Sequence, residues 1–188
     1  MSSAARKTER FLHFATPAGY DDPLGMLLGC HRRIEKKLAT LKDLCAHLAV
    51  KGVDAEASAA AQGVLRYFDT SAKYHHQDEE TDLLPLLEAR ASGTDRDHLR
   101  SIAARLVGEH HEIERIWTRL RKPLEGIAEG LMRPIAQTDV QAFTTLCRRH
   151  IEEEESFLVP LASRTLGGAE LTALGRAMAA RRGAAFPG

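Results

Sequence analysis

The sequence predicts an all-α protein organised as an up-down-up-down four-helix bundle. Apolar residues recur at the spacing of one helix face in four long segments. No segment shows the strict apolar–polar alternation of a half-buried strand. The four segments also form two pairs of similar design. We therefore expect a bundle over residues 23–163, preceded by an N-terminal arm at residues 1–22 and followed by a short helix at residues 168–182.

The composition narrows the class of protein. With 188 residues, 44% of them apolar, the chain can bury a core. Its 26 basic and 26 acidic residues cancel, and no basic stripe with interleaved aromatic residues indicates a nucleic-acid partner. The N-terminal residues lack an apolar signal-peptide core, and no apolar run approaches the roughly 20 residues of a membrane span. Three cysteines without a Cys-x-x-Cys pattern are typical of reduced thiols, so we expect a cytoplasmic protein.

The first two helices have clear signals at their ends. Asp22 can cap a helix with Pro23 at its first position, and this helix should end near Gly52. Asp54 can cap the second helix, which should run to about residue 90. Pro85 lies inside it, and an interior proline removes a backbone hydrogen bond, so we expect a bend or break near residues 81–85.

The second half of the chain repeats this arrangement. A third helix should stop before Pro123, because proline cannot continue the hydrogen-bonding pattern. Residues 123–137 contain two glycines and two prolines, and we expect them to form the longest irregular connection. A fourth helix should follow and run to about Ser163.

One motif occurs in both the second and the fourth helix. Its pattern is Phe-x6-His-x3-Glu-Glu-x2-Leu-x-Pro-Leu, which is too long to match by chance. The first copy comprises Phe68, His75, Glu79, Glu80, Leu83, Pro85 and Leu86, and the second comprises Phe143, His150, Glu154, Glu155, Leu158, Pro160 and Leu161. The motif therefore predicts two equivalent helices that present the same polar side chains to the core.

The first and third helices also match each other, and all four helices carry His-x3-Glu. The four pairs are His31 and Glu35, His75 and Glu79, His110 and Glu114, and His150 and Glu154. Side chains four residues apart are neighbours on a helix, so one helix can present an imidazole and a carboxylate to a shared centre. Each histidine is in phase with core residues, and unpartnered buried charges are costly. Metal ions would satisfy these groups together, and imidazole with carboxylate suits iron, manganese or zinc.

The repeats decide between neighbouring candidates. His75 aligns with His150, whereas His76 aligns with Ile151, so His75 is the expected ligand and His76 should pack at its flank. His111 aligns with Arg32, which indicates a position in solvent. Glu80 and Glu155 each lie about 100° further round the helix than the preceding glutamate, which predicts outer or surface acids.

Other polar residues have two readings. Glu35 and Glu114 are either additional ligands or surface acids that pair with neighbouring Lys or Arg side chains. Cys30 is expected to be a small buried filler. Phe68 and Trp117 should wall the site without taking part in chemistry. Tyr67 and Tyr74 either pack in the core or donate a hydrogen bond to a bound ligand. The remaining histidines are expected to lie at the surface: His13, His47 and His98.

These residues resemble the hemerythrin-like, or HHE cation-binding, family. The second-helix element HHQDEETDLLP is close to the family signature, and the likeness covers about residues 23–163. The resemblance implies a four-helix bundle around a non-haem di-iron centre. Carried over by position, its ligands would be His31, His75, Glu79, His110, His150 and Glu154.

The chain departs from the oxygen-carrying hemerythrins at two positions. Glu114 stands where their third helix has a second histidine, and only three residues separate His150 from Glu154. A more anionic site favours sensing or reduction over reversible oxygen carriage. The sequence thus predicts a protein with two iron ions, or with manganese or zinc, that binds or senses oxygen, nitric oxide, peroxide or iron itself. The alternatives are a di-iron enzyme that decomposes peroxide or reduces nitric oxide or oxygen, and a structural zinc or metal-free bundle.

Overall fold

The computed structural model describes residues 18–187, and within this range helices occur without any strand. The predicted arm at residues 1–22, including His13, lies mostly outside the described residues. The elements in order are α1 (Pro23–Lys51), α2 (Ala55–Arg66), η1 (Tyr67–Ser71), α3 (Ala72–Gln77), η2 (Asp78–Leu83), α4 (Leu84–Arg90), α5 (Gly93–Ala128), α6 (Gln137–Glu153), η3 (Glu154–Leu158), α7 (Val159–Thr165) and α8 (Gly168–Arg181), where η marks a π-helical turn. The all-α prediction is therefore confirmed.

The first helix begins and ends as predicted. The Asp22 side chain accepts a hydrogen bond from the Gly25 backbone N–H at 3.0 Å, and a proline follows at the first position. Gly52 closes the helix with a φ of 75°, a conformation that costs glycine little. Asp54 then caps α2 by accepting from the Ala57 N–H at 2.9 Å. Local chemistry thus sets the tight connection between α1 and α2.

The predicted end of the third helix before Pro123 is wrong. The helix α5 continues through Pro123 to Ala128, so the irregular connection is shorter than residues 123–137. An interior proline costs about 3 kcal/mol, because the carbonyl four residues earlier loses its partner. The next turn buries Leu124 and Ile127 completely. Full burial of each such side chain is worth about 1.5–3 kcal/mol, which offsets the cost of the proline.

Near residues 81–85, where we expected a bend or break, the second helix continues but widens into the π-helical turn η2. The Leu84 N–H bonds to the Glu79 carbonyl, five residues earlier, in place of the usual four. The fourth helix repeats this change at η3, where the Val159 N–H bonds to the Glu154 carbonyl. In both copies a proline occupies the second position of the helix that follows. A widened turn relieves the clash between a proline ring and the carbonyl before it.

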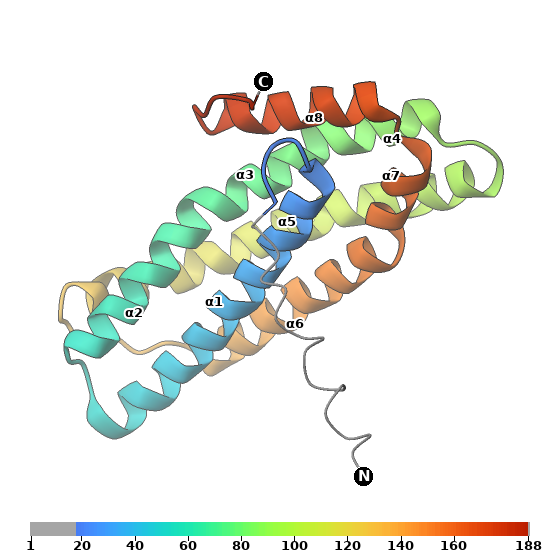
Figure 1. Cartoon of the computed structure of the whole chain (residues 1–188). Helices are drawn as coiled ribbons and strands as arrows, with labels where there is room; N and C mark the ends of the chain where they lie inside the picture. The colour runs from blue at the N-terminus through green and yellow to red at the C-terminus, as the bar shows by residue number, and fades with distance from the viewer. Residues whose placement is uncertain (1–17, 188) are drawn as a thin grey trace, which may run out of the picture.

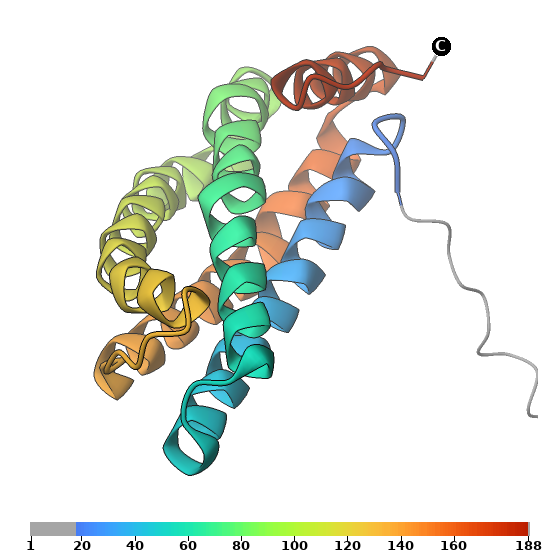
Figure 2. The same cartoon turned by 90° about the vertical axis from the view of Figure 1, so that its left-hand side faces the viewer.

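The long helices pack side by side around two apolar clusters (Figures 1 and 2). One cluster, at the end where α1 meets α2, includes Leu38, Trp117 and Phe143. The other, at the end nearest α8, includes Leu87 and Leu161. In the first three long helices the clustered histidines and glutamates fall between members of these two clusters in the sequence, and in the fourth helix Glu154 does so. The site is therefore held between two packed apolar layers.

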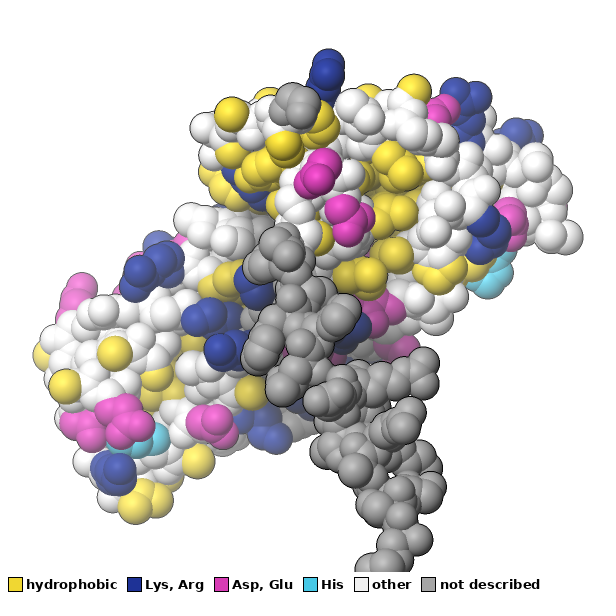
Figure 3. Space-filling view, in the orientation of Figure 1, with side chains coloured by type: hydrophobic (Ala, Val, Ile, Leu, Met, Phe, Trp, Pro, Cys, Tyr) yellow, Lys and Arg dark blue, Asp and Glu magenta, His cyan; other side chains and the backbone are white. Residues whose placement is uncertain are grey.

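The helix α8 lies across one end of the other helices, alongside α4 (Figure 1). It contacts both η2 and α1 and buries Leu174 and Met178. None of the helices within residues 18–187 has the length and hydropathy to cross a bilayer. On the face shown in Figure 3, basic and acidic side chains are interspersed, in keeping with a net charge near zero.

Candidate metal centre

The structure brings together the six side chains that the sequence analysis singled out. His31 comes from α1 and His110 from α5. The second long helix, which runs from α2 to α4, supplies His75 and Glu79, and the fourth, which runs from α6 to α7, supplies His150 and Glu154. All are almost fully buried, with exposed fractions of 0–3%: His31, His75, Glu79, His110, His150 and Glu154. Nine-tenths or more of each group is therefore removed from water, in a polar layer between two apolar clusters.

The six residues form two overlapping groups of potential metal ligands. The first adds His31 and His75 to the two glutamates, and the second adds His110 and His150 to the same two glutamates. Within each group the donor atoms all lie within 4.8 Å of one another. Glu79 and Glu154 belong to both groups, so each carboxylate can contribute one oxygen to each of two neighbouring ions.

Short distances link the histidines to the shared carboxylates. The Nε2 atom of His31 lies 3.1 Å from Glu154 Oε2, and that of His150 lies 2.9 Å from Glu154 Oε1. Glu79 is approached by the Nε2 atoms of His75 and His110, each at 3.4 Å. The same nitrogen is thus turned inward in all four rings. The duplicated motif explains this, because identical local spacing places His and Glu on the same face of both helices.

Several of these inward atoms have no hydrogen-bond partner among the described residues. They are Nε2 of His31, both ring nitrogens of His75, Oε2 of Glu79 and both carboxylate oxygens of Glu154. Each unpaired buried polar group costs about 1–3 kcal/mol, and more when it is charged. Imidazole nitrogens and carboxylate oxygens are the donors that iron, manganese and zinc accept. The residues present therefore fit a pair of such metal ions.

In three of the four histidines, the nitrogen that faces away from the cluster is held by an outer carboxylate. Nδ1 of His31 donates to Glu155 at 2.9 Å, and Nδ1 of His110 donates to Glu80 at 2.6 Å. Nδ1 of His150 donates to Glu109 at 3.0 Å. Such bonds fix the ring orientation and leave Nε2 free as a ligand atom. Glu80 and Glu155 were expected to be outer or surface acids, and here they lie beside the cluster.

Glu109 was missed by the sequence analysis. It is 6% exposed and bridges His150 to Arg149, which donates to its other oxygen at 2.7 Å. In the alignment of the first and third helices its counterpart is Cys30, so the repeat gave no signal for it. Because it directly precedes His110 on the helix, its side chain points in a different direction, toward α6 and not toward the centre. Only the packing of α5 against α6 reveals it.

The electrostatics of the metal-free cluster follow from burial and mutual charge. Burial, and next the charge of Glu154, raises the pKa of Glu79 to about 7. Burial opposes ionisation of Glu154 too, but the charge of His150 and the close approach of the His110, His150 and His31 rings hold its pKa well below the usual range. Burial alone would lower the pKa of His110, but the nearby Glu154 and Glu79 carboxylates outweigh this and raise it to about 10. Burial holds the pKa of His75 well below its usual value. Protons thus stabilise a cluster that is otherwise rich in negative charge.

The remaining candidates lie outside both groups. Glu35 is paired with Arg32 at 3.3 Å and Glu114 approaches Lys73 at 4.0 Å, with 44% and 62% of their side chains exposed. The ring of His76 stacks on His110 at the flank, with 4.0 Å between ring centroids. The three cysteines Cys30, Cys45 and Cys147 are buried and form no disulfide, and His98 and His111 are exposed. The Tyr67 hydroxyl donates to the Cys30 carbonyl, and the Tyr74 ring lies under the Arg182 guanidinium. His47 pairs with Asp54.

The fold and the buried cluster together define a class of helical proteins whose core presents histidines and carboxylates to cations. The model of the hemerythrin HHE cation binding domain matches residues 22–162, and the chain belongs to this family. An uncharacterized protein of Haemophilus influenzae is 28% identical over 165 residues, which cover 88% of this chain and 92% of the relative. The family resemblance predicted from the motif is therefore confirmed.

Proposed function

We propose that the chain binds two non-haem metal ions, with iron as the physiological metal. The observation that carries the proposal is the sharing of Glu79 and Glu154 by two ligand groups, each completed by two histidines. Each ion would receive two imidazoles and two carboxylate oxygens. Four protein ligands leave coordination positions open on a metal that prefers six. Manganese or zinc would fit the same donors, and metal analysis of the purified protein distinguishes the three.

We further propose that the open positions bind a small oxidant or diatomic ligand, namely oxygen, nitric oxide or peroxide. When bound, a pair of irons supplies redox chemistry toward such ligands. The residues of this chain hold the ions, orient three of the four imidazoles through their outer bonds, and exclude bulk water from the layer. Support comes from the apolar packing on both sides of the cluster and from the small size, about 20 Å³, of the space beside His150.

Turnover of such a ligand is the second candidate. Glu80 bonds to His110 and is also one-third exposed at a pocket beside the cluster. A carboxyl in that position can exchange protons between the pocket and solvent, which peroxide decomposition or nitric oxide reduction requires.

The proposal also includes the up-down-up-down topology, the bundle limits at residues 23–163 and the separate C-terminal helix. They are supported by short connections between successive long helices.

Metal analysis of protein purified from iron-supplemented cells tests the proposal. We expect about two irons per chain and an absorption spectrum that changes on addition of nitric oxide, oxygen or peroxide. Reversible spectral changes would support binding or sensing, and steady peroxide loss that Glu79→Ala abolishes would support an enzyme. One zinc per chain, or no metal after loading attempts with iron and manganese, would refute the di-iron proposal.

Two adjacent histidines provide a sharper prediction. His75→Ala should weaken metal binding by more than the roughly 10- to 100-fold that loss of an outer partner costs. His76→Ala should retain two ions per chain, because the His76 ring lies outside both ligand groups. Elemental analysis of the two variants after identical loading gives the answer. Metal loss in His76→Ala with retention in His75→Ala would show that the assignment is wrong by one residue.

A further inference from the structure

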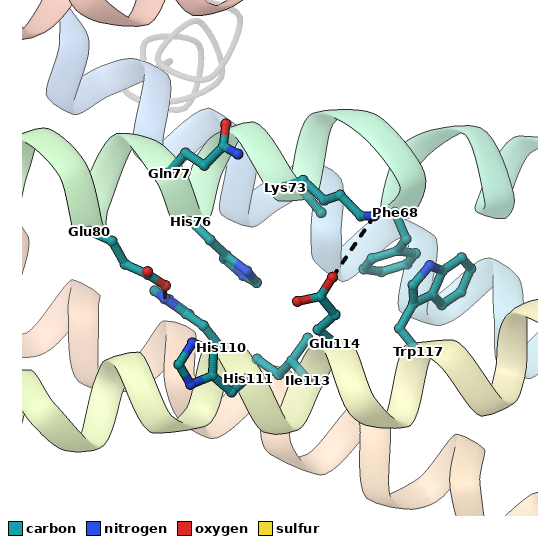
Figure 4. Close-up of a pocket in the computed structure, with 11 residues that line it drawn as sticks. Phe68, Lys73, His76, Gln77, Glu80, His110, His111, Ile113, Glu114 and Trp117 are labelled. Carbon is teal, nitrogen blue, oxygen red and sulfur yellow. Dashed lines mark hydrogen bonds and ion pairs between the residues drawn. The ribbon is translucent and has the colours of Figure 1, made fainter.

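Two spaces lie on either side of the His76 ring. The outer one is a pocket of about 230 Å³ between the second helix and α5, with Trp117 and His111 in its walls (Figure 4). The inner one is about 20 Å³ and lies against His150 and Cys147. Both spaces are lined by the same four residues, Phe68, Ala72, His76 and Ile113. These side chains therefore form the partition between the outer pocket and the inner cavity.

His76 is the member of this partition that is least constrained. Its ring is nearly parallel to that of His110, with an interplanar angle of 11°, and it lies 6.2 Å from the His150 ring. It forms no hydrogen bond with the described residues, whereas outer carboxylates hold the rings of His110 and His150. Figure 4 shows it projecting from α3 toward α5, in the middle of the pocket. Rotation of this side chain therefore breaks ring contacts but no hydrogen bond within the described residues.

We propose that His76 is the gate through which ligands reach the metal centre, and that it selects them by size. The proposal rests on the proposed function for its biological meaning. The inner cavity exceeds the 10–15 Å³ needed for one water-sized molecule, so it fits a diatomic ligand, peroxide or a small linear anion. The outer pocket is about ten times larger and admits bulkier molecules, which the closed ring keeps from the inner cavity.

Cys147 reports on passage through the gate without any metal. Its thiol lines the inner cavity and is buried, as are the thiols of Cys30 and Cys45, which line neither space. In metal-free protein, methyl methanethiosulfonate should label Cys147 about tenfold faster in His76→Ala than in the unchanged protein. The other two thiols serve as internal references, because partial unfolding would expose all three. Mass spectrometry of time-quenched samples measures the three rates separately.

Two further variants separate a steric gate from a general loosening. His76→Phe keeps a flat ring without its nitrogens and should return Cys147 labelling to the original rate. His111→Ala removes a histidine from the outer pocket alone and should leave labelling unchanged. Equal acceleration at all three thiols of His76→Ala, or no acceleration at Cys147, would overturn the gate.

Azide binding to the iron-loaded protein extends the test to the centre itself. Stopped-flow absorbance should give an association rate about tenfold higher in His76→Ala than in the unchanged protein or His76→Phe. If the chain binds no metal, the proposed function fails while the thiol rates still decide the gate. If two irons bind but Cys147 labelling is the same in all variants, the gate is wrong and the metal centre stands.

Discussion

Three of the four clustered histidines are oriented by a carboxylate on a different helix. His31 on α1 bonds to Glu155 in η3, His110 on α5 bonds to Glu80 in η2, and His150 on α6 bonds to Glu109 on α5. Each bond therefore fixes a ring and also joins two helices. Arg32 and Arg149 in turn bond to two of these carboxylates at 2.8 and 2.7 Å. At two of the histidines, a carboxylate and then an arginine thus follow one another outward from the centre.

Glu109 provides a test of this outer layer. Glu109→Ala should lower metal affinity about 10- to 100-fold, because the ring of His150 loses its orienting partner. Glu112→Ala is the matched control, since that glutamate is exposed on the same helix and pairs with Arg115. Competition with a chelator measures both affinities. Equal affinities in the two variants would contradict an orienting role for Glu109.

The sequence was sufficient to predict which six side chains meet, and insufficient to predict what holds them. His75 and His150 could be aligned because their helices share a motif, and this alignment also separated His75 from His76. Glu109 and Asp78 carry no such signal. Each depends on contacts between residues 40 or more positions apart, such as Arg149 with Glu109 and Arg182 with Asp78.

At the scale of the elements, prolines shape the helices differently according to their surroundings. Pro85 and Pro160 each follow a π-helical turn and occupy an early position in the next helix, where their missing N–H is tolerated. Pro123 lies inside α5, and the helix continues because the turn beyond it is buried. A local rule alone predicted a bend or break near residues 81–85, where a π-helical turn interrupts the regular α-helix, and a stop before Pro123. Tertiary packing overrides that rule at Pro123, where the turn beyond the proline is buried.

This difference predicts opposite effects for two substitutions. Pro123→Ala should stabilise the protein by about 1–3 kcal/mol, because it restores an N–H to a helix that is already continuous. Pro85→Ala should bring no gain, since Pro85 already occupies a position where proline is accepted. Urea unfolding followed by circular dichroism gives both free energies. A gain from Pro85→Ala that matches the gain from Pro123→Ala would show that the two prolines are equally strained.

At the scale of the whole molecule, α8 is tied to the layer that contains the centre. Asp78 is fully buried and directly precedes Glu79, at the start of η2. Arg181 and Arg182 at the end of α8 both bond to its carboxylate, and Arg182 donates to Asp78 Oδ1 at 3.0 Å. The C-terminal helix therefore neutralises a charge that the second helix buries beside the cluster. The same helix also buries Met178 in the apolar cluster at this end of the molecule.

Removal of both arginines should be strongly destabilising. Arg181→Ala with Arg182→Ala leaves the buried Asp78 carboxylate unpaired, a change that typically costs about 3–5 kcal/mol. Addition of Asp78→Ala to this pair should recover a large part of the loss, because the unpaired carboxylate at this position is then removed. Thermal and urea unfolding of the three proteins measure the effect. If the triple variant is less stable than the double variant, the carboxylate is not the source of the penalty.

Metal binding should stabilise the folded protein, and more so at higher pH. In the metal-free protein the pKa of Glu79 is raised from 4.5 to about 7, so the folded state loses stability as pH rises through that range. The pKa of His110 is raised from 6.5 to about 10, so the stability it contributes is present below 6.5 and is lost as pH rises toward 10. A bound metal ion replaces these protons and removes both losses.

The gap in Tm between loaded and metal-free protein should therefore widen between about pH 6 and pH 8.5. With free metal at about 100 times Kd, stabilisation is about 2.7 kcal/mol, or about 5–10 °C for a chain of this size. Calcium is the control cation, because it prefers oxygen ligands and should give little shift at any pH. A gap that stays constant or narrows with rising pH would mean that the metal does not displace protons from this cluster. The same two groups would then titrate in the loaded protein, and the ions would have to lie elsewhere in the molecule.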